Sequence, residues 1–213
     1  HRLVPGKSAL LVIDMQHGFL DEGASLEVVA GRAIIPTIRG LVDAFRAKGA
    51  PVIFTEFVYA DNVPCLRGDP FGVEHLPAKE GGPIGLEHPS SNCLIGPNAG
   101  EGVESAETVE ELAPLRGELV IQGHTYDKFY GTPLDLSLRS QGITHLVATG
   151  ITTDVCVSGT VISGTTRDYR VTLATDGVGS PFPDLHEAAL KLLAHKFARL
   201  KTCEELIDEL TSF

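Results

Sequence analysis

Short apolar runs alternate with amphipathic stretches along the chain. The runs occupy residues 9–13, 51–54, 119–121, 146–148 and 171–173. Residues 9–13 are apolar at every position, which is typical of a strand buried on both faces of a parallel sheet. Runs of this kind, separated by helix-length stretches, predict an α/β fold.

Three of the intervening stretches have a helical pattern. The first places Ile34, Ile38 and Phe45 on one face, with Gly49 as its end. The second covers residues 133–139 and carries a proline in its first turn. The third is expected to begin at a capping Asp184 and to bury the following apolar residues: Leu185, Ala189, Leu192, Leu193 and Phe197. The order of elements predicts a three-layer, doubly wound parallel sheet flanked by helices.

Residues 62–117 break this alternation. They hold seven of the thirteen prolines, many glycines and no sustained period. We expect one domain over residues 1–213, with 62–117 as a long irregular insertion that forms a lid or a subunit contact. A solvated excursion without a function is the alternative.

The charge balance is acidic, with 17 basic and 28 acidic residues and a formal net charge of -11. Like charge repels nucleic acid and anionic membranes, so neither is expected as a partner. No apolar run approaches the roughly 20 residues of a membrane helix. The four cysteines lack CxxC pairing and histidine partners, which favours free thiols, a reducing compartment and a cytoplasmic location.

Ligands of open parallel sheets bind beyond the carboxyl ends of the strands. Asp14 directly follows the first run, where a half-buried carboxylate can serve as a base. A turn or capping role is the alternative. Cys156 follows the fourth run at the start of an expected helix, where the helix dipole gives a thiol thiolate character. The alternative for Cys156 is a small buried hydrophobic residue.

Several segments taken in order resemble the cysteine hydrolases of the isochorismatase-like superfamily. They are Leu-Val-Ile-Asp-Met-Gln at 11–16, Glu-Leu-Ala-Pro-Leu at 111–115, Phe-Tyr-Gly-Thr-Pro-Leu at 129–134, Gly-Ile-Thr-Thr-Asp-Val-Cys-Val at 150–157 and Thr-Asp at 175–176. The resemblance runs from about residue 8 to about residue 176, interrupted by the insertion.

This resemblance implies an aspartate, lysine and cysteine set that hydrolyses C–N bonds of small amides, ureas or carbamoyl compounds. Asp14 would take the proton of Cys156, whose thiolate would attack the carbonyl carbon. The oxyanion would rest on the backbone N–H groups of Thr152 and Cys156, and the peptide before Thr152 is commonly cis in the family. The resemblance further implies a small-molecule substrate, no cofactor, and a homodimer or homotetramer.

One position departs from the family pattern. The lysine expected nine residues before Thr132 is replaced by Gly123. Either Lys128 enters from the following loop and supplies the charge, or the cation is lost and His124 or a substrate group tunes the thiolate. An ordinary surface role is the remaining possibility for Lys128.

Aromatic residues on the loops beyond the strands suggest a partly apolar or planar substrate. Phe19, Phe57, His124 and Tyr126 are the candidate substrate-binding residues. The metal-binding set of aspartate and histidine residues of nicotinamidases, expected after the second strand, is missing, and His75 and His88 lack ligand spacing. We therefore expect no metal and disfavour nicotinamide as the substrate.

Three functions remain open from the sequence. The first is a cysteine amidohydrolase that uses Asp14 and Cys156. The second is isochorismatase-type vinyl-ether hydrolysis, in which the aspartate acts as an acid and no cysteine is required. The third is a catalytically degenerate homologue that binds a small molecule or a partner.

Overall fold

The protein folds around a six-stranded parallel sheet with the strand order β3-β2-β1-β4-β5-β6. The structure is a computed structural model and describes residues 1–24, 26–58, 93 and 102–212. The predicted α/β class and doubly wound sheet are confirmed. Most of the predicted insertion at 62–117, including Cys65, His75 and His88, lies outside the described residues, and its proposed lid or contact role stays a prediction.

The elements follow one another in a β-α order. The strands are β1 Ser8–Ile13, β2 Val52–Phe57, β3 Leu119–Gly123, β4 His145–Ile151, β5 Arg170–Gly179 and β6 Arg199–Lys201. The α-helices are α1 His17–Leu20, α2 Val29–Ala47, α3 Leu134–Ser140, α4 Ser158–Thr166, α5 Pro183–Lys196 and α6 Cys203–Thr211. Short 3-10 turns cover Gly102–Glu104 and Glu110–Leu112, and a π-helical turn covers Thr153–Val157.

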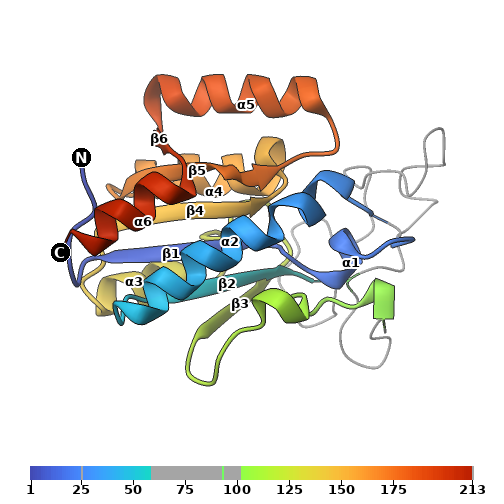
Figure 1. The fold of residues 1–213 in the computed structure, drawn as a ribbon, viewed down its shortest axis with the longest axis horizontal. Helices are drawn as coiled ribbons and strands as arrows, with labels where there is room; N and C mark the ends of the chain where they lie inside the picture. Colours follow the sequence, from blue (N-terminus) through green and yellow to red (C-terminus); the bar gives the residue numbers. More distant parts are fainter. Residues whose placement is uncertain (25, 59–92, 94–101, 213) are drawn as a thin grey trace.

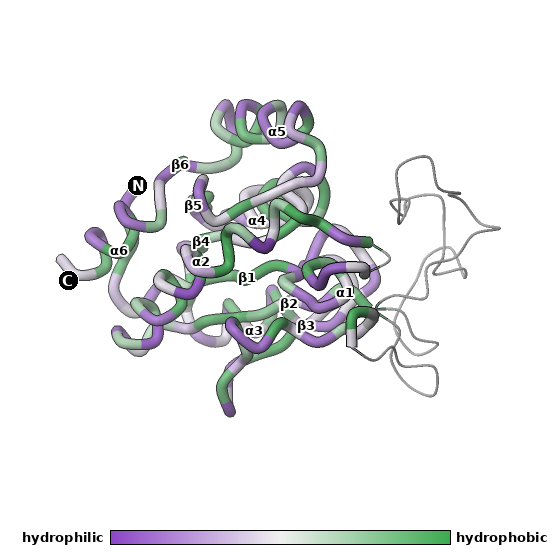
Figure 2. Tube along the Cα trace, turned by 45° about the vertical axis from the view of Figure 1, so that its right-hand side comes forward, coloured by the Kyte–Doolittle hydropathy of each residue, from purple (hydrophilic) through white to green (hydrophobic). Residues whose placement is uncertain are grey.

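Helices cover both faces of the sheet. Alternate residues of β1 divide between two cores: Leu10 and Val12 pack with α2 and α6, whereas Leu11 and Ile13 pack with α3, α4 and α5. Figure 1 shows α2 and α6 crossing in front of the sheet. Figure 2 shows β1 as an apolar segment among helices of mixed polarity. Burial on both faces explains why the strand sequences are apolar without alternation.

Gly150 brings the end of β4 against the end of β1. Its φ is +110°, and an added Cβ would lie 2.0 Å from the carbonyl oxygen of Ile13. The pairing of β4 with β5 shifts register between Ala148 and Gly150. Glycine is therefore required here, because only a residue without Cβ allows this close approach. The contact sets the spacing between Asp14, which follows Ile13, and the turn that carries Cys156.

The third predicted helix exists but is less buried than expected. Ala189 and Leu193 of α5 are buried, whereas Leu185 and Leu192 are 45% and 50% exposed. Asp184 lies in the first turn, and Phe182 occupies the N-cap, so the expected cap is wrong. The neighbouring edge strand β6 is only three residues long and offers α5 a narrow surface to cover.

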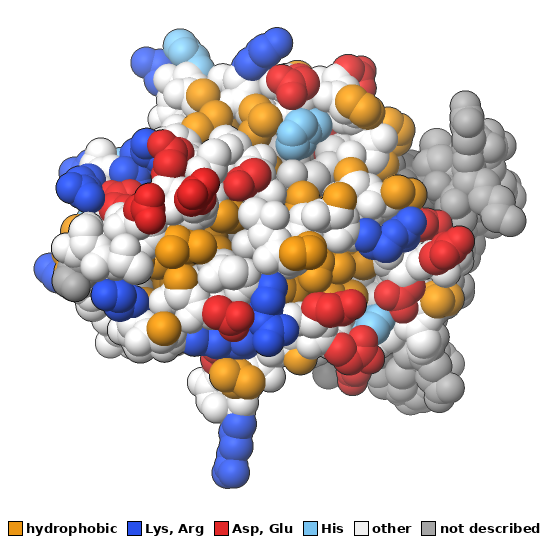
Figure 3. All heavy atoms as spheres, viewed as in Figure 1, with side chains coloured by type: hydrophobic (Ala, Val, Ile, Leu, Met, Phe, Trp, Pro, Cys, Tyr) orange, Lys and Arg blue, Asp and Glu red, His pale blue; other side chains and the backbone are white. Residues whose placement is uncertain are grey.

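Charged side chains of both signs are interspersed on the face shown in Figure 3. Within the described ranges, every helix is too short or too polar to cross a membrane. The expected cytoplasmic location, the homo-oligomeric state and the extent of a single domain over residues 1–213 stay predictions.

Candidate active site

Asp14 lies immediately beyond β1 and is oriented by the neighbouring strand. Its φ of +55° is in the left-handed region, and its backbone N–H donates to the carbonyl oxygen of Thr55 at 3.1 Å. Thr55 stands opposite Ile13 in the β1–β2 pairing. The backbone of Asp14 is therefore held in place by both β1 and β2.

Both carboxylate oxygens of Asp14 have a partner. The hydroxyl of Thr55 donates to Oδ1 at 2.7 Å, and Nζ of Lys128 lies 2.7 Å from Oδ2. The side chains of Asp14 and Lys128 are each only 1% exposed. Because a buried charge is costly without a partner, the two ions depend on each other.

Lys128 reaches this carboxylate from the loop that follows β3. Its Nζ also donates to the carbonyl oxygen of Thr125 at 3.0 Å and lies 4.9 Å from the ring centroid of Phe57. An aromatic face attracts a cation in this position. The surface role considered for Lys128 is wrong, because its side chain is buried beside Asp14.

Gly123, which stands where the family lysine is expected, closes β3 and is buried. An added Cβ there would lie 3.0 Å from the methyl carbon of Thr132, so the position is tightly packed. Lys128, whose ammonium lies beside Asp14, stands five residues later along the chain, in a loop instead of at a strand end.

Cys156 lies in the π-helical turn Thr153–Val157 and is 8% exposed. Burial raises the pKa of the Cys156 thiol well above its usual value, and the charge and hydrogen bond of Asp14 raise it further. The positive charge of Lys128 and a backbone hydrogen bond from Thr152 act in the opposite direction on the same pKa. Burial thus outweighs the thiolate character that was expected from the start of the helix.

The peptide between Ile151 and Thr152 is cis, as the resemblance implies. The backbone of Thr152, one of the two expected oxyanion donors, is among the groups that lower the pKa of the Cys156 thiol. The backbone N–H groups of Val155 and Val157 instead donate to the carbonyl oxygen of Thr152, which fixes this turn.

The four candidate substrate-binding aromatics form one cluster around Phe57. The ring centroid of Phe57 lies 5.8 Å from that of Tyr126 with nearly parallel planes, 5.0 Å from that of His124 and 6.4 Å from that of Phe19. Phe57 and His124 are buried, whereas Phe19 and Tyr126 are partly exposed. The cluster thus lies beside the Lys128 ammonium, and Phe57 covers that ammonium.

Thr55 is the site residue that the sequence reasoning missed. It is fully buried at the carboxyl end of β2. The available signal was a hydroxyl residue directly after an apolar run, at the edge of the sheet where ligands bind.

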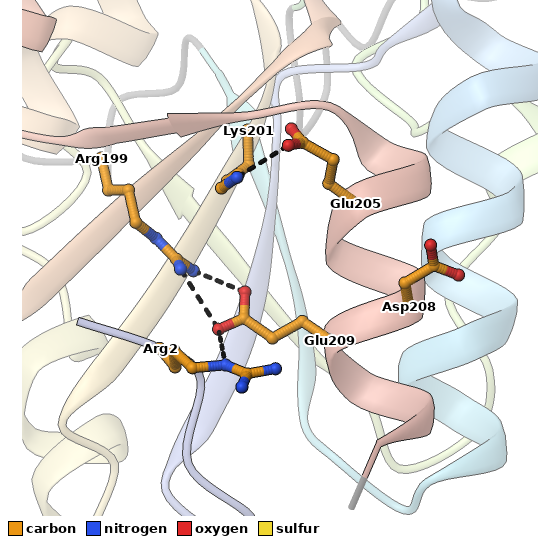
Figure 4. Close-up of a pocket in the computed structure, with 6 residues that line it drawn as sticks. All are labelled: Arg2, Arg199, Lys201, Glu205, Asp208 and Glu209. Atoms are coloured by element: carbon orange, nitrogen blue, oxygen red, sulfur yellow. Dashed lines mark hydrogen bonds and ion pairs between the residues drawn. The ribbon is translucent and has the colours of Figure 1, made fainter.

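Two other features of the described residues do not add to this site. No group of three or more His, Cys, Asp or Glu side chains among them is arranged to hold a metal ion. A groove of about 440 Å³ lies beside β6 and α6, and Figure 4 shows the residues that line it. The chain termini lie at this end of the molecule (Figure 1). The charged side chains of the groove mostly pair with one another, for example Arg199 with Glu209 and Lys201 with Glu205.

The chain resembles several known proteins over most of its length. Residues 8–205 match the model of the isochorismatase domain. The chain is 30% identical over 210 residues to the ureidoacrylate amidohydrolase RutB of Enterobacter sp. (strain 638), an alignment that covers 96% of this chain and 89% of that protein.

Two solved structures have the same fold. A cysteine hydrolase from Pseudomonas syringae pv. phaseolicola 1448A superposes with a TM-score of 0.79 at 23% identity, covering 100% of this chain and 96% of that one. The N-carbamoylsarcosine amidase from Thermoplasma acidophilum superposes with a TM-score of 0.71 at 24% identity, covering 93% of this chain and 97% of that one.

Proposed function

The chain belongs to the isochorismatase family of hydrolases, and on that premise we propose that it cleaves a C–N bond of a small amide, urea or carbamoyl compound through a thioester on Cys156. The observation that carries this proposal is the buried ion pair of Asp14 with Lys128 at 2.7 Å, whose two charges shift the pKa of the Cys156 thiol in opposite directions. A base in contact with a protonated nucleophile is the arrangement that nucleophilic catalysis requires.

The first half-reaction begins with proton transfer from Sγ of Cys156 to Asp14. The thiolate attacks the carbonyl carbon, and the electron pair of the C=O bond moves onto oxygen. The backbone N–H groups of Thr152 and Cys156 stabilise this oxyanion. As the C–N bond breaks, Asp14 gives its proton to the leaving nitrogen, and the acyl or carbamoyl group stays on sulfur.

The second half-reaction hydrolyses this intermediate. Asp14, again a carboxylate, takes a proton from water, and the resulting hydroxide attacks the thioester carbon. The C–S bond breaks and the proton on Asp14 returns to the Cys156 sulfur. The net reaction consumes one water and releases an amine and a carboxylic or carbamic acid.

Lys128 supplies the positive charge for both halves. Its charge lowers the pKa of the Cys156 thiol and so opposes the effects of burial and of Asp14. It also holds one Asp14 oxygen by an ion pair, while Thr55 holds the other by a hydrogen bond. Because both of its oxygens are held, the carboxylate keeps its orientation during proton transfer, and this favours the transfer.

Ureides are the substrate class that we propose to test first. The similarity to a ureidoacrylate amidohydrolase covers nearly the whole chain. Phe19 and Tyr126, the partly exposed members of the aromatic cluster, are the residues proposed to contact the planar part of such a substrate. Phe57 and His124 are proposed to act mainly by packing around Lys128.

Ammonia and amine release from ureidoacrylate, N-carbamoylsarcosine and simple primary amides tests this function. We expect Cys156→Ala and Asp14→Asn each to abolish turnover, whereas Cys203→Ala, which changes a buried cysteine at the start of α6, keeps it. Turnover of a vinyl-ether substrate instead of these compounds, lost in Asp14→Asn and kept in Cys156→Ala, would favour vinyl-ether hydrolysis. The absence of turnover with every compound, together with tight binding of one of them, would favour a degenerate binding homologue.

A further inference from the structure

The loop that carries Lys128, residues 124–132, is attached to the helix that follows the nucleophile. The backbone N–H of Lys128 donates to the hydroxyl of Thr160 on α4 at 3.2 Å, and that hydroxyl donates to the carbonyl oxygen of Tyr126 at 3.3 Å. Gly159 of α4 lies against the same backbone, with an ideal Cβ 3.4 Å from the carbonyl carbon of Tyr126. The loop therefore rests directly on α4.

Asp127 makes the side-chain connection between the two segments. Its Oδ2 accepts a hydrogen bond from the hydroxyl of Ser163 on α4 at 2.7 Å, and its Oδ1 accepts from the backbone N–H of Phe129 at 2.8 Å. The Asp127 carboxylate thus holds the backbone at Phe129, the residue after Lys128, and connects it to α4 through Ser163. Arg167 donates to the same Ser163 hydroxyl, which keeps the hydroxyl in place.

We propose that Asp127 and Ser163 are positioning residues that set the Lys128 ammonium against Asp14 and Cys156. The inference rests on the proposed function, in which Lys128 supplies the charge. Cys156 lies in the turn that runs directly into α4, so a loop fixed to α4 moves together with the nucleophile. With glycine at position 123, this attachment replaces the strand end on which the family lysine is expected.

The physical need for such an attachment follows from the lysine side chain. Its four-carbon stem is flexible, and the position of its ammonium depends on the backbone from which the stem starts. A displacement of about 1 Å at a catalytic centre can cost on the order of 100-fold in rate. A loop residue therefore needs the fixed backbone that Asp127, Ser163 and Thr160 provide.

Alkylation of Cys156 by iodoacetamide tests the proposal without a known substrate. The rate is followed at each pH by mass spectrometry of the Cys156 peptide. We expect Lys128→Met to move the alkylation profile to higher pH, and Asp127→Ala and Ser163→Ala to move it in the same direction by a smaller amount. Asp127→Asn keeps an oxygen for the Phe129 N–H but removes the charge, so its profile should lie at the native pH or slightly below it.

The direction in which the alkylation profile shifts distinguishes a loss of Lys128 positioning from the direct electrostatic effect of removing the Asp127 charge. Removing the negative charge of Asp127 alone would favour the thiolate and move the profile to lower pH. Asp135→Ala, which removes a partly exposed carboxylate that pairs with Arg139 on α3, is the control for loss of a carboxylate and should leave the profile unchanged. In the Lys128→Met background, Asp127→Ala should cause no further shift of the alkylation profile, because Asp127 affects Cys156 only by positioning the lysine.

Each outcome bears on one part of the account. An unchanged profile in both Asp127→Ala and Ser163→Ala, with Lys128→Met displaced, overturns the positioning role and leaves the proposed function intact. Equal additional shifts in the native and Lys128→Met backgrounds overturn it as well. A native profile and native turnover in Lys128→Met contradict the role of Lys128 in the proposed function itself. If Asp127→Ala does not fold, Ser163→Ala, which keeps the charge, decides the question.

Discussion

The Nζ atom of Lys128 lies 2.7 Å from Oδ2 of Asp14, and neither side chain is more than 1% exposed. Removing one member of a buried ion pair typically costs about 3–5 kcal/mol of stability, because the other charge loses its partner. The same pair determines the chemistry, since Asp14 raises and Lys128 lowers the pKa of the Cys156 thiol. Substitutions of the two residues should therefore have opposite effects on the thiol.

Lys128→Met should lower turnover roughly tenfold or more, because the thiol loses the positive charge that lowers its pKa. The pH at which Cys156 becomes reactive should rise. Steady-state kinetics and thiol alkylation measure the two effects. Lys201→Met, which removes an exposed lysine paired with Glu205, is the control and should keep native values. Unchanged turnover in Lys128→Met would rule out its catalytic role.

Asp14→Asn should shift the reactivity of Cys156 in the other direction. The carboxylate raises the pKa of the thiol both by its charge and by a hydrogen bond. Its neutral replacement leaves Lys128 to stabilise the thiolate, so alkylation should proceed at lower pH than in the native chain. Turnover should nevertheless be lost, because the base is absent. Slower alkylation at every pH would contradict this electrostatic account.

Thr55→Val should lower kcat about tenfold with KM nearly unchanged, since it removes the hydrogen bond to Asp14 Oδ1 but keeps the shape of the side chain. Thr55→Ser should restore most of the activity. Thr149→Val is a matched control, because Thr149 is equally buried on β4 but donates to the backbone of Leu11. Equal kinetic losses in the Thr55→Val and Thr149→Val variants would indicate a general packing effect.

Gly150→Ala should lower the free energy of unfolding by about 3 kcal/mol or more, from backbone strain together with overpacking against Ile13. Gly142→Ala is the comparison, since Gly142 has a φ of +70° and open space around an added Cβ. That variant should lose only about 1–2 kcal/mol. Denaturant unfolding measures both values, and equal losses would show that the contact with Ile13 is unimportant.

Most of the sheet could be predicted from the sequence, because strands buried on both faces have continuous apolar runs. Strand β6 could not, since its three residues include Arg199 and Lys201 and form only an edge. Helix α6 was also missed, although its capping box, in which Thr202 and Glu205 exchange hydrogen bonds, is a signal that the sequence contains.

The candidate site residues could be predicted where they directly follow a strand. Asp14 and Cys156 each follow an apolar run that reaches the same edge of the sheet. The sequence could not decide the role of Lys128. Its burial results from contacts of its loop with the end of β1 and with α4, and no local sequence pattern predicts such contacts. The thiol pKa was misjudged for the same reason, since burial outweighs the start of the helix.

Rapid acid quenching of the protein with ureidoacrylate and with N-carbamoylsarcosine, followed by mass spectrometry of the Cys156 peptide, tests the central claim most directly. The account predicts an acyl or carbamoyl adduct on the Cys156 sulfur that forms before product and disappears as product accumulates. The adduct should be missing in Cys156→Ala and present in Cys203→Ala. Turnover of either compound without any adduct on Cys156, and with full activity in Cys156→Ala, would contradict it.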